Sequence, residues 1–185
     1  MQAQSFTLYG LIVACETAFW LVLVAALAAR YLLRREHLGR ALLLSLPVID
    51  VLLLTFTALD LKAGRAATFA HGLATAYVGF TAAFGSVAVR WADQRFAHWF
   101  ASGPPPVKAP DQGWKAVQLD LQLWFRCIAA WLIAVPLLSA LIVYVDDEAV
   151  TQSLHIWYRI AFGSVFLWFV FGPVWSLLFL ARKAQ

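Results

Sequence analysis

Six ionisable side chains interrupt the long apolar runs of this 185-residue chain, and their types could do chemistry. A charged group at mid-depth in a bilayer costs about 2.5–3.5 kcal/mol or more, so such groups normally face the protein interior or a wet cavity. Carboxylates and imidazoles placed there can pair with a cation, relay a proton or bind a metal ion. The six residues are Glu16, Asp50, Asp60, His71, His155 and Arg159.

Asp50 is the central residue of this set. It lies about nine residues into an apolar run over residues 41–61, or about 14 Å along a helix, which is near the middle of a membrane. Asp60 lies at the outer end of the same run, and His71 lies in the outer third of the next one. The other three residues also fall in the outer half, so four helices are expected to contribute to a shared polar site.

Two interpretations of these residues need no cofactor. In the first, an acid pairs with Arg159 or with a histidine and fixes the order of the helices, because buried charges persist only when paired. In the second, Asp50 and His71 form a path for protons or ions. We expect the ligand or proton site to comprise Glu16, Asp50, Asp60, His71 and Arg159.

Two further interpretations need a cofactor, and the sequence predicts none. Asp60, His71 and His155, with Glu16, are ligand types that zinc accepts, but compact spacings such as HExxH are absent. A haem held between His71 and His155 would be supported only by the presence of these two histidines in the sequence. Metal and haem therefore stay open. The chain has no GxSxG, P-loop or GxGxxG motif, so an enzyme has no positive support and no catalytic residue is predicted.

The elements that position these residues follow from composition. The chain is 63% hydrophobic and 13% charged, whereas soluble domains have about 45–50% apolar and about 25% charged residues. Its apolar runs are close to the 20 residues of a membrane-spanning helix, and they lack the alternation of a membrane barrel. We predict one all-α bundle of about five transmembrane helices, at residues 8–33, 41–61, 66–89, 121–145 and 154–181.

The positive charges predict how the bundle is oriented. One side of the predicted topology collects eleven of the 14 lysines and arginines, and cytoplasmic loops carry such an excess. The N-terminus is therefore expected outside and the C-terminus in the cytoplasm, with an amphipathic interfacial segment at residues 90–120. The net charge of +4 fits this bias, and no soluble basic face predicts nucleic-acid binding.

Residues 66–89 are rich in alanine and glycine, and Gly72, Ala76, Gly79 and Ala83 fall on one stripe. Small residues let helix backbones approach closely in lipid. This helix is therefore expected at the centre of the bundle.

Residues 46–100 resemble the YmcC-like small membrane proteins of bacteria. The resemblance is carried by Leu46-Pro47-Val48-Ile49-Asp50, Asp60-Leu61-Lys62-Ala63-Gly64, Ala67-Thr68-Phe69-Ala70-His71-Gly72, Tyr77-Val78-Gly79, Ala83-Phe84-Gly85 and Trp91-Ala92-Asp93-Gln94-Arg95-Phe96. It implies a protein of the bacterial inner membrane and marks Asp50, Asp60, His71 and Asp93 as positions in the motif. The resemblance implies no activity.

The leading hypothesis is a small non-catalytic membrane protein with an accessory, interaction or small-ligand-binding role and a buried polar cluster. The alternatives are a proton- or ion-coupled transporter that uses Asp50 and His71, and an intramembrane enzyme that depends on a metal or haem. The expected partners are the lipid bilayer and either a membrane protein or a second copy of the chain.

Overall fold

The computed structural model describes residues 2–33, 35–100, 103–110 and 113–178, and within the first helix it leaves out the side chains of residues 2–9, 11–13 and 16. The described chain is helical and contains no strand, which confirms the all-α bundle. Its main helices are α1 (Gln2–Tyr31), α2 (Glu36–Lys62), α3 (Phe69–Phe100), α4 (Trp114–Val145) and α6 (Ile156–Phe169), with a short α5 (Glu148–Thr151) before a 3-10 turn η1 (Gln152–Leu154).

Four helical stretches in the described part are long and apolar enough to cross a membrane. They are Glu36–Lys62, Phe69–Phe100, Trp114–Val145 and Glu148–Leu178, while the apolar part of α1 for which side chains are described is the shorter Thr17–Tyr31. The last stretch contains a π-helical turn, η2 (Val170–Val174), around Pro173. Proline lacks the N–H that would continue the regular hydrogen-bond pattern, which accounts for the irregular turn at this point.

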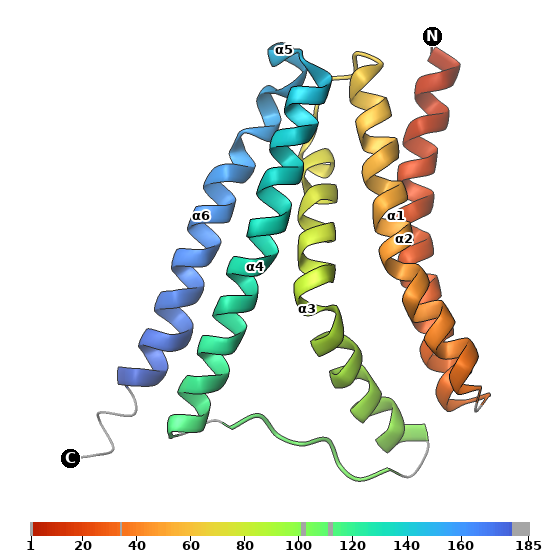
Figure 1. Ribbon diagram of the computed structural model, residues 1–185. Coiled ribbons are helices and arrows are strands. Elements are labelled where there is room, and N and C mark those ends of the chain that lie inside the picture. The colour runs from red at the N-terminus through yellow and green to blue at the C-terminus, as the bar shows by residue number, and fades with distance from the viewer. Residues whose placement is uncertain (1, 34, 101–102, 111–112, 179–185) are drawn as a thin grey trace.

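Figure 1 shows α1 and α2 as an antiparallel pair on one side, α4 and α6 on the other, and α3 between them. The largest interhelical contacts are α1 with α2 and α3 with α4, and α3 also touches α1 and α2. The place of α3 between the two pairs agrees with its small-residue composition.

The small residues on α3 allow this close packing. A methyl group at Gly79 would lie 2.3 Å from the carbonyl oxygen of Ala130 in α4, and one at Gly72 would lie 2.0 Å from the indole of Trp157. Since real atoms do not approach so closely, neither glycine can carry a side chain here without a shift. The predicted stripe of Gly72, Ala76, Gly79 and Ala83 is buried.

The helix bounds differ from the predicted ones at the polar segment between residues 90 and 120. α3 continues to Phe100 instead of ending at residue 89, and α4 begins at Trp114 instead of residue 121. Aromatic residues continue at helical spacing after residue 89, and no glycine or proline interrupts them before Gly103. Within the expected interfacial segment, residues 90–100 are thus the last turns of α3 and residues 114–120 are the first turns of α4. Residues 103–110 form a non-helical part of the connection.

The last turns of α3 are tied to α1. Figure 1 shows this part of α3 turning away from α4 toward the end of the α1–α2 pair. Arg30 of α1 donates to the Asp93 carboxylate at 2.8 Å, and the rings of Tyr31 and Phe96 lie 6.0 Å apart. These contacts explain the direction that the segment takes.

Candidate functional site

The predicted site residues fall into two separate places in the structure. Asp50 lines a pocket between α1, α2 and α3, whereas Asp60 and His71 form a cluster where α2 ends and α3 begins. The two carboxylates are ten residues apart on α2, or about 15 Å along the helix axis. The structure therefore does not bring Asp50 and His71 together.

In the Asp60–His71 cluster, the Asp60 carboxylate faces two basic side chains. The Asp60 side chain is fully buried, its Oδ2 lies 3.3 Å from Nε2 of His71, and its Oδ1 lies 3.3 Å from Nε of Arg65. The Arg65 N–H is not directed at Oδ1 closely enough for a hydrogen bond, so that contact is a charge attraction. Asp60 thus has a hydrogen-bonding neighbour at Oδ2 and a positive charge near Oδ1.

The N-terminus of α3 determines the tautomer of His71. The backbone N–H of Thr68, the residue before α3, donates to Nδ1 of His71 at 3.0 Å, and the Thr68 hydroxyl lies 2.8 Å from the same nitrogen. A backbone N–H can only donate, so Nδ1 carries no proton and Nε2 carries the hydrogen that faces Asp60. His71 is the third residue of α3, and its Nδ1 accepts the backbone N–H of the residue that caps the helix. This is the role that the third helical residue has in a capping box.

This arrangement bears on the metal and haem interpretations. Both ring nitrogens of His71 are engaged in hydrogen bonds, while His155 is exposed with its ring against Tyr158. Within the described residues, no group of three or more His, Cys, Asp or Glu side chains is placed to hold a metal ion. The structure thus does not assemble the predicted ligand set of Asp60, His71 and His155.

Of the two remaining predicted residues, Arg159 lies apart from both places, and the side chain of Glu16 is outside the described part of the structure. Arg159 is exposed on α6, and in the described chain it makes no ion pair; Arg65 is the arginine that faces a buried acid. Glu16 belongs to α1, but its side chain lies outside the described ones. Sequence analysis did not include Arg65 in the site, although its position five residues after Asp60, beyond the end of the helix, was a signal that its side chain could fold back.

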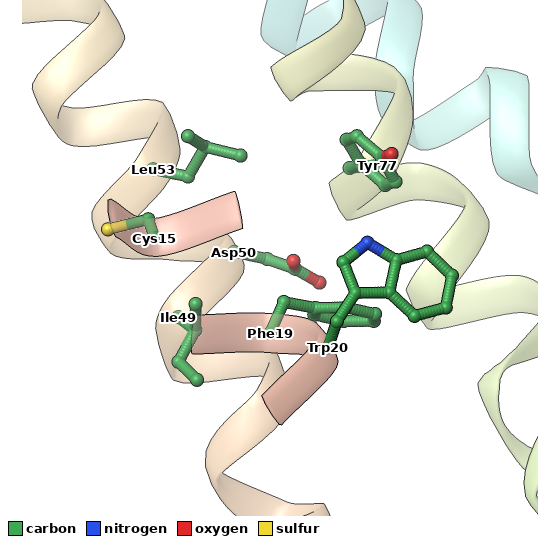
Figure 2. A pocket seen from close by; sticks show the side chains of 7 residues that line it. All are labelled: Cys15, Phe19, Trp20, Ile49, Asp50, Leu53 and Tyr77. Carbon is green, nitrogen blue, oxygen red and sulfur yellow. The ribbon is translucent and has the colours of Figure 1, made fainter. Parts of the chain in front are cut away.

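The pocket at Asp50 has a different character. Asp50 is 3% exposed, and the other lining residues are Cys15, Phe19, Trp20, Ile49, Leu53 and Tyr77. Figure 2 shows the carboxyl group pointing from α2 toward the rings of Phe19 and Trp20, with Tyr77 on the α3 side. The pocket has room for about one water molecule.

The Asp50 carboxyl group is only partly satisfied. The Thr81 hydroxyl of α3 is its neighbouring hydrogen-bond donor, but Oδ2 is buried and has no partner in the described structure. Neither lysine, arginine nor histidine is among the residues that line the pocket. A buried carboxyl group with an orphan oxygen is costly, and a buried charge needs a partner.

Comparison with known proteins places the chain beside one membrane protein. It is 39% identical over 145 residues to "Uncharacterized membrane protein YmcC" of Bacillus subtilis (strain 168), a match that spans 78% of this chain and 77% of that protein. No family model and no solved structure matches the chain.

Proposed function

The chain belongs to the YmcC-like family of bacterial membrane proteins, and from that premise we propose that it is a non-catalytic protein that binds a small ligand at the Asp50 pocket. The observation that carries this proposal is the unpartnered Oδ2 of Asp50 in the wall of a pocket. The rest of the argument compares this carboxyl group with the other buried one on the same helix.

Asp60 fits the structural interpretation of buried charges, and Asp50 does not. Asp60 faces Arg65 and His71, so its contacts hold α2 against the start of α3. Asp50 has no such cation, although its side chain is nearly as buried. An acid that served only to join helices would be expected to face a cation, because a buried charge persists only when it is paired. The free oxygen at a cavity favours a role toward something that enters the cavity.

Proton-coupled transport has less support. It would use Asp50 and His71 together, yet these residues lie in separate places and both nitrogens of His71 are already bonded. Five helices are also few for the paired repeats of an alternating-access transporter. An accessory role, with a membrane-protein partner or a second copy of the chain, remains a prediction from the sequence.

The proposal includes the placement of the protein in the inner membrane. The chain would have its N-terminus outside and its C-terminus in the cytoplasm, as the distribution of lysine and arginine predicts. The Asp60–His71 cluster and the α2–α3 connection would then lie toward the outside, and the Asp50 pocket near the membrane midplane.

A carboxyl-directed reagent tests whether the pocket is open to small molecules. Membranes containing the protein are treated with dicyclohexylcarbodiimide, which reacts with carboxyl groups in apolar surroundings, and the modified residue is mapped by peptide mass spectrometry. We expect modification at Asp50, because the orphan oxygen faces the pocket. Mapping on the unaltered protein makes the result independent of how a variant folds.

Two variants complete the test. Asp50→Asn should lose the modification, whereas Asp93→Asn, which alters an acid paired with Arg30 at the other end of α3, should keep it. If the reagent leaves Asp50 untouched while it modifies other acids of the same preparation, the pocket is closed and the proposed function is wrong.

A further inference from the structure

The wall of the Asp50 pocket indicates the charge of its ligand. Among the described residues that line it, Asp50 is the only carboxylic acid, and the others are aromatic, aliphatic or cysteine. A carboxylate in such surroundings is stable when a positive charge or a proton neutralises it. An anionic ligand would add a second negative charge without any basic side chain to receive it. The residues that line the pocket therefore favour a positively charged ligand.

The aromatic residues indicate which kind of cation. Phe19 and Trp20 of α1 have ring centroids 5.7 Å apart with planes at 84°, and the Tyr77 ring of α3 lies 6.4 Å from that of Phe19. Aromatic faces attract ammonium groups, and this attraction is stronger where water is excluded. Metal cations such as Mg²⁺ or Ca²⁺ need several oxygen ligands, and the pocket wall supplies one carboxylate and the Tyr77 hydroxyl.

The shape of the pocket indicates the size of the charged group. The pocket has room for about one water molecule, which matches an ammonium group more closely than a trimethylammonium group. Trp20 is 59% exposed and Ile49 is partly exposed, so these two lining residues form an apolar rim that is open to the outside of the bundle. An alkyl chain attached to the ammonium group could leave along this apolar rim toward lipid.

We propose that the Asp50 pocket binds the primary ammonium group of an alkylamine, with the carboxylate of Asp50 as its counter-ion and the rings of Phe19, Trp20 and Tyr77 around it. This assignment rests on the proposed function, since it requires the pocket to be open to ligands. The same chemistry is present in a free amine and in the amino headgroup of phosphatidylethanolamine.

The test measures binding of butylammonium to the purified full chain in nanodiscs of phosphatidylglycerol, which contain no competing amine. Titration calorimetry should show saturable binding of butylammonium and none of butanol, which has the same chain without the charge. Asp50→Asn should weaken binding at least about tenfold, because the counter-ion is lost. Trp20→Leu should weaken it by about threefold, the scale of one cation–π contact.

A control variant tests whether the effects are specific to the pocket, and a second lipid identifies the source of the amine. Phe162→Leu, which alters a 77% exposed ring on α6, should bind butylammonium as the unaltered protein does. Nanodiscs that also contain phosphatidylethanolamine identify the source: weaker butylammonium binding there indicates the lipid headgroup as occupant, and unchanged binding indicates a free amine.

Absence of butylammonium binding in phosphatidylglycerol, or equal binding by Asp50→Asn, would overturn the assignment. If carbodiimide still modifies Asp50 in that case, the pocket is open and only the ligand class is wrong. If it does not, the proposed function fails as well.

Discussion

The imidazole of His71 stands between Asp60 and the first turn of its own helix: Nε2 lies 3.3 Å from Oδ2 of Asp60, and Nδ1 accepts the backbone N–H of Thr68. One side chain thereby joins the end of α2 to the start of α3 and supplies an acceptor that the helix start would otherwise lack. The same carboxylate faces Arg65 in the connecting segment. This helical corner is therefore held by polar contacts that are largely removed from water.

Asp60→Ala should destabilise the protein more than the loss of a surface ion pair. It would leave the Nε2–H of buried His71 without its acceptor, which costs about 1–3 kcal/mol in the free energy of unfolding. The control is Asp93→Ala, whose ion pair with Arg30 is partly exposed and is expected to contribute about 0–1 kcal/mol. Both values can be measured by denaturant unfolding in detergent micelles. Equal losses for the two variants would contradict the role of the corner.

Gly72→Ala should also destabilise the bundle, for a packing reason. The added methyl group would overlap the indole of Trp157, and overpacking of this kind costs about 1–3 kcal/mol. Gly163→Ala is the matched control, because a methyl group there meets nothing within 4 Å, and alanine favours a helix by about 1 kcal/mol. Thermal unfolding should show a lower midpoint for the first variant and an unchanged or higher one for the second. A stable Gly72→Ala protein would mean that Trp157 can move aside at little cost.

Cysteine accessibility tests the predicted orientation. In a background without Cys15 and Cys127, Ala63→Cys places a thiol in the α2–α3 connection, and Ala109→Cys places one in the α3–α4 connection; both positions are exposed. A membrane-impermeant maleimide should label the first variant in intact cells and the second only after lysis, because the positive charges predict the second segment on the cytoplasmic side. The reverse labelling would invert the topology.

His71 is expected to be a structural residue that binds neither a metal ion nor haem. Both of its ring nitrogens are occupied by protein partners, so ligation would require breaking the contact with Thr68 or with Asp60. The purified protein should therefore show no Soret absorption and no stoichiometric zinc by elemental analysis. His71→Ala should lower the unfolding midpoint and leave both measurements as they were. A haem spectrum that disappears in His71→Ala would refute this expectation.

The local sequence pattern was sufficient to predict the helices, but it predicted their ends less accurately. Apolar runs of membrane-spanning length leave few alternatives, because backbone polar groups in lipid must be satisfied within the segment. The end of α3 was placed too early because a charged residue, Arg90, resembled a boundary. A helix can leave the membrane and continue in water, so the change from apolar to polar residues does not mark its end. Gly103 and the prolines after it do.

The pairing of the buried groups could not be predicted from the sequence. Asp50 and Asp60 are both acids in one apolar helix, and sequence analysis combined Asp50 with His71 for a proton path and Asp60 with His71 for a metal site. Which carboxylate faces the imidazole depends on how α3 is placed against α2, and that placement depends on side chains distant in sequence, such as Trp157 over Gly72.

The sequence by itself determined that this chain is a bundle of membrane helices with acids and histidines inside it, because the cost of exposing polar groups to lipid acts on each segment separately. Only the tertiary structure decided that Asp60 is neutralised within the protein while Asp50 faces a pocket lined by aromatic rings. That difference arises from the rotation and spacing of neighbouring helices, which depend on the packing of all of them together.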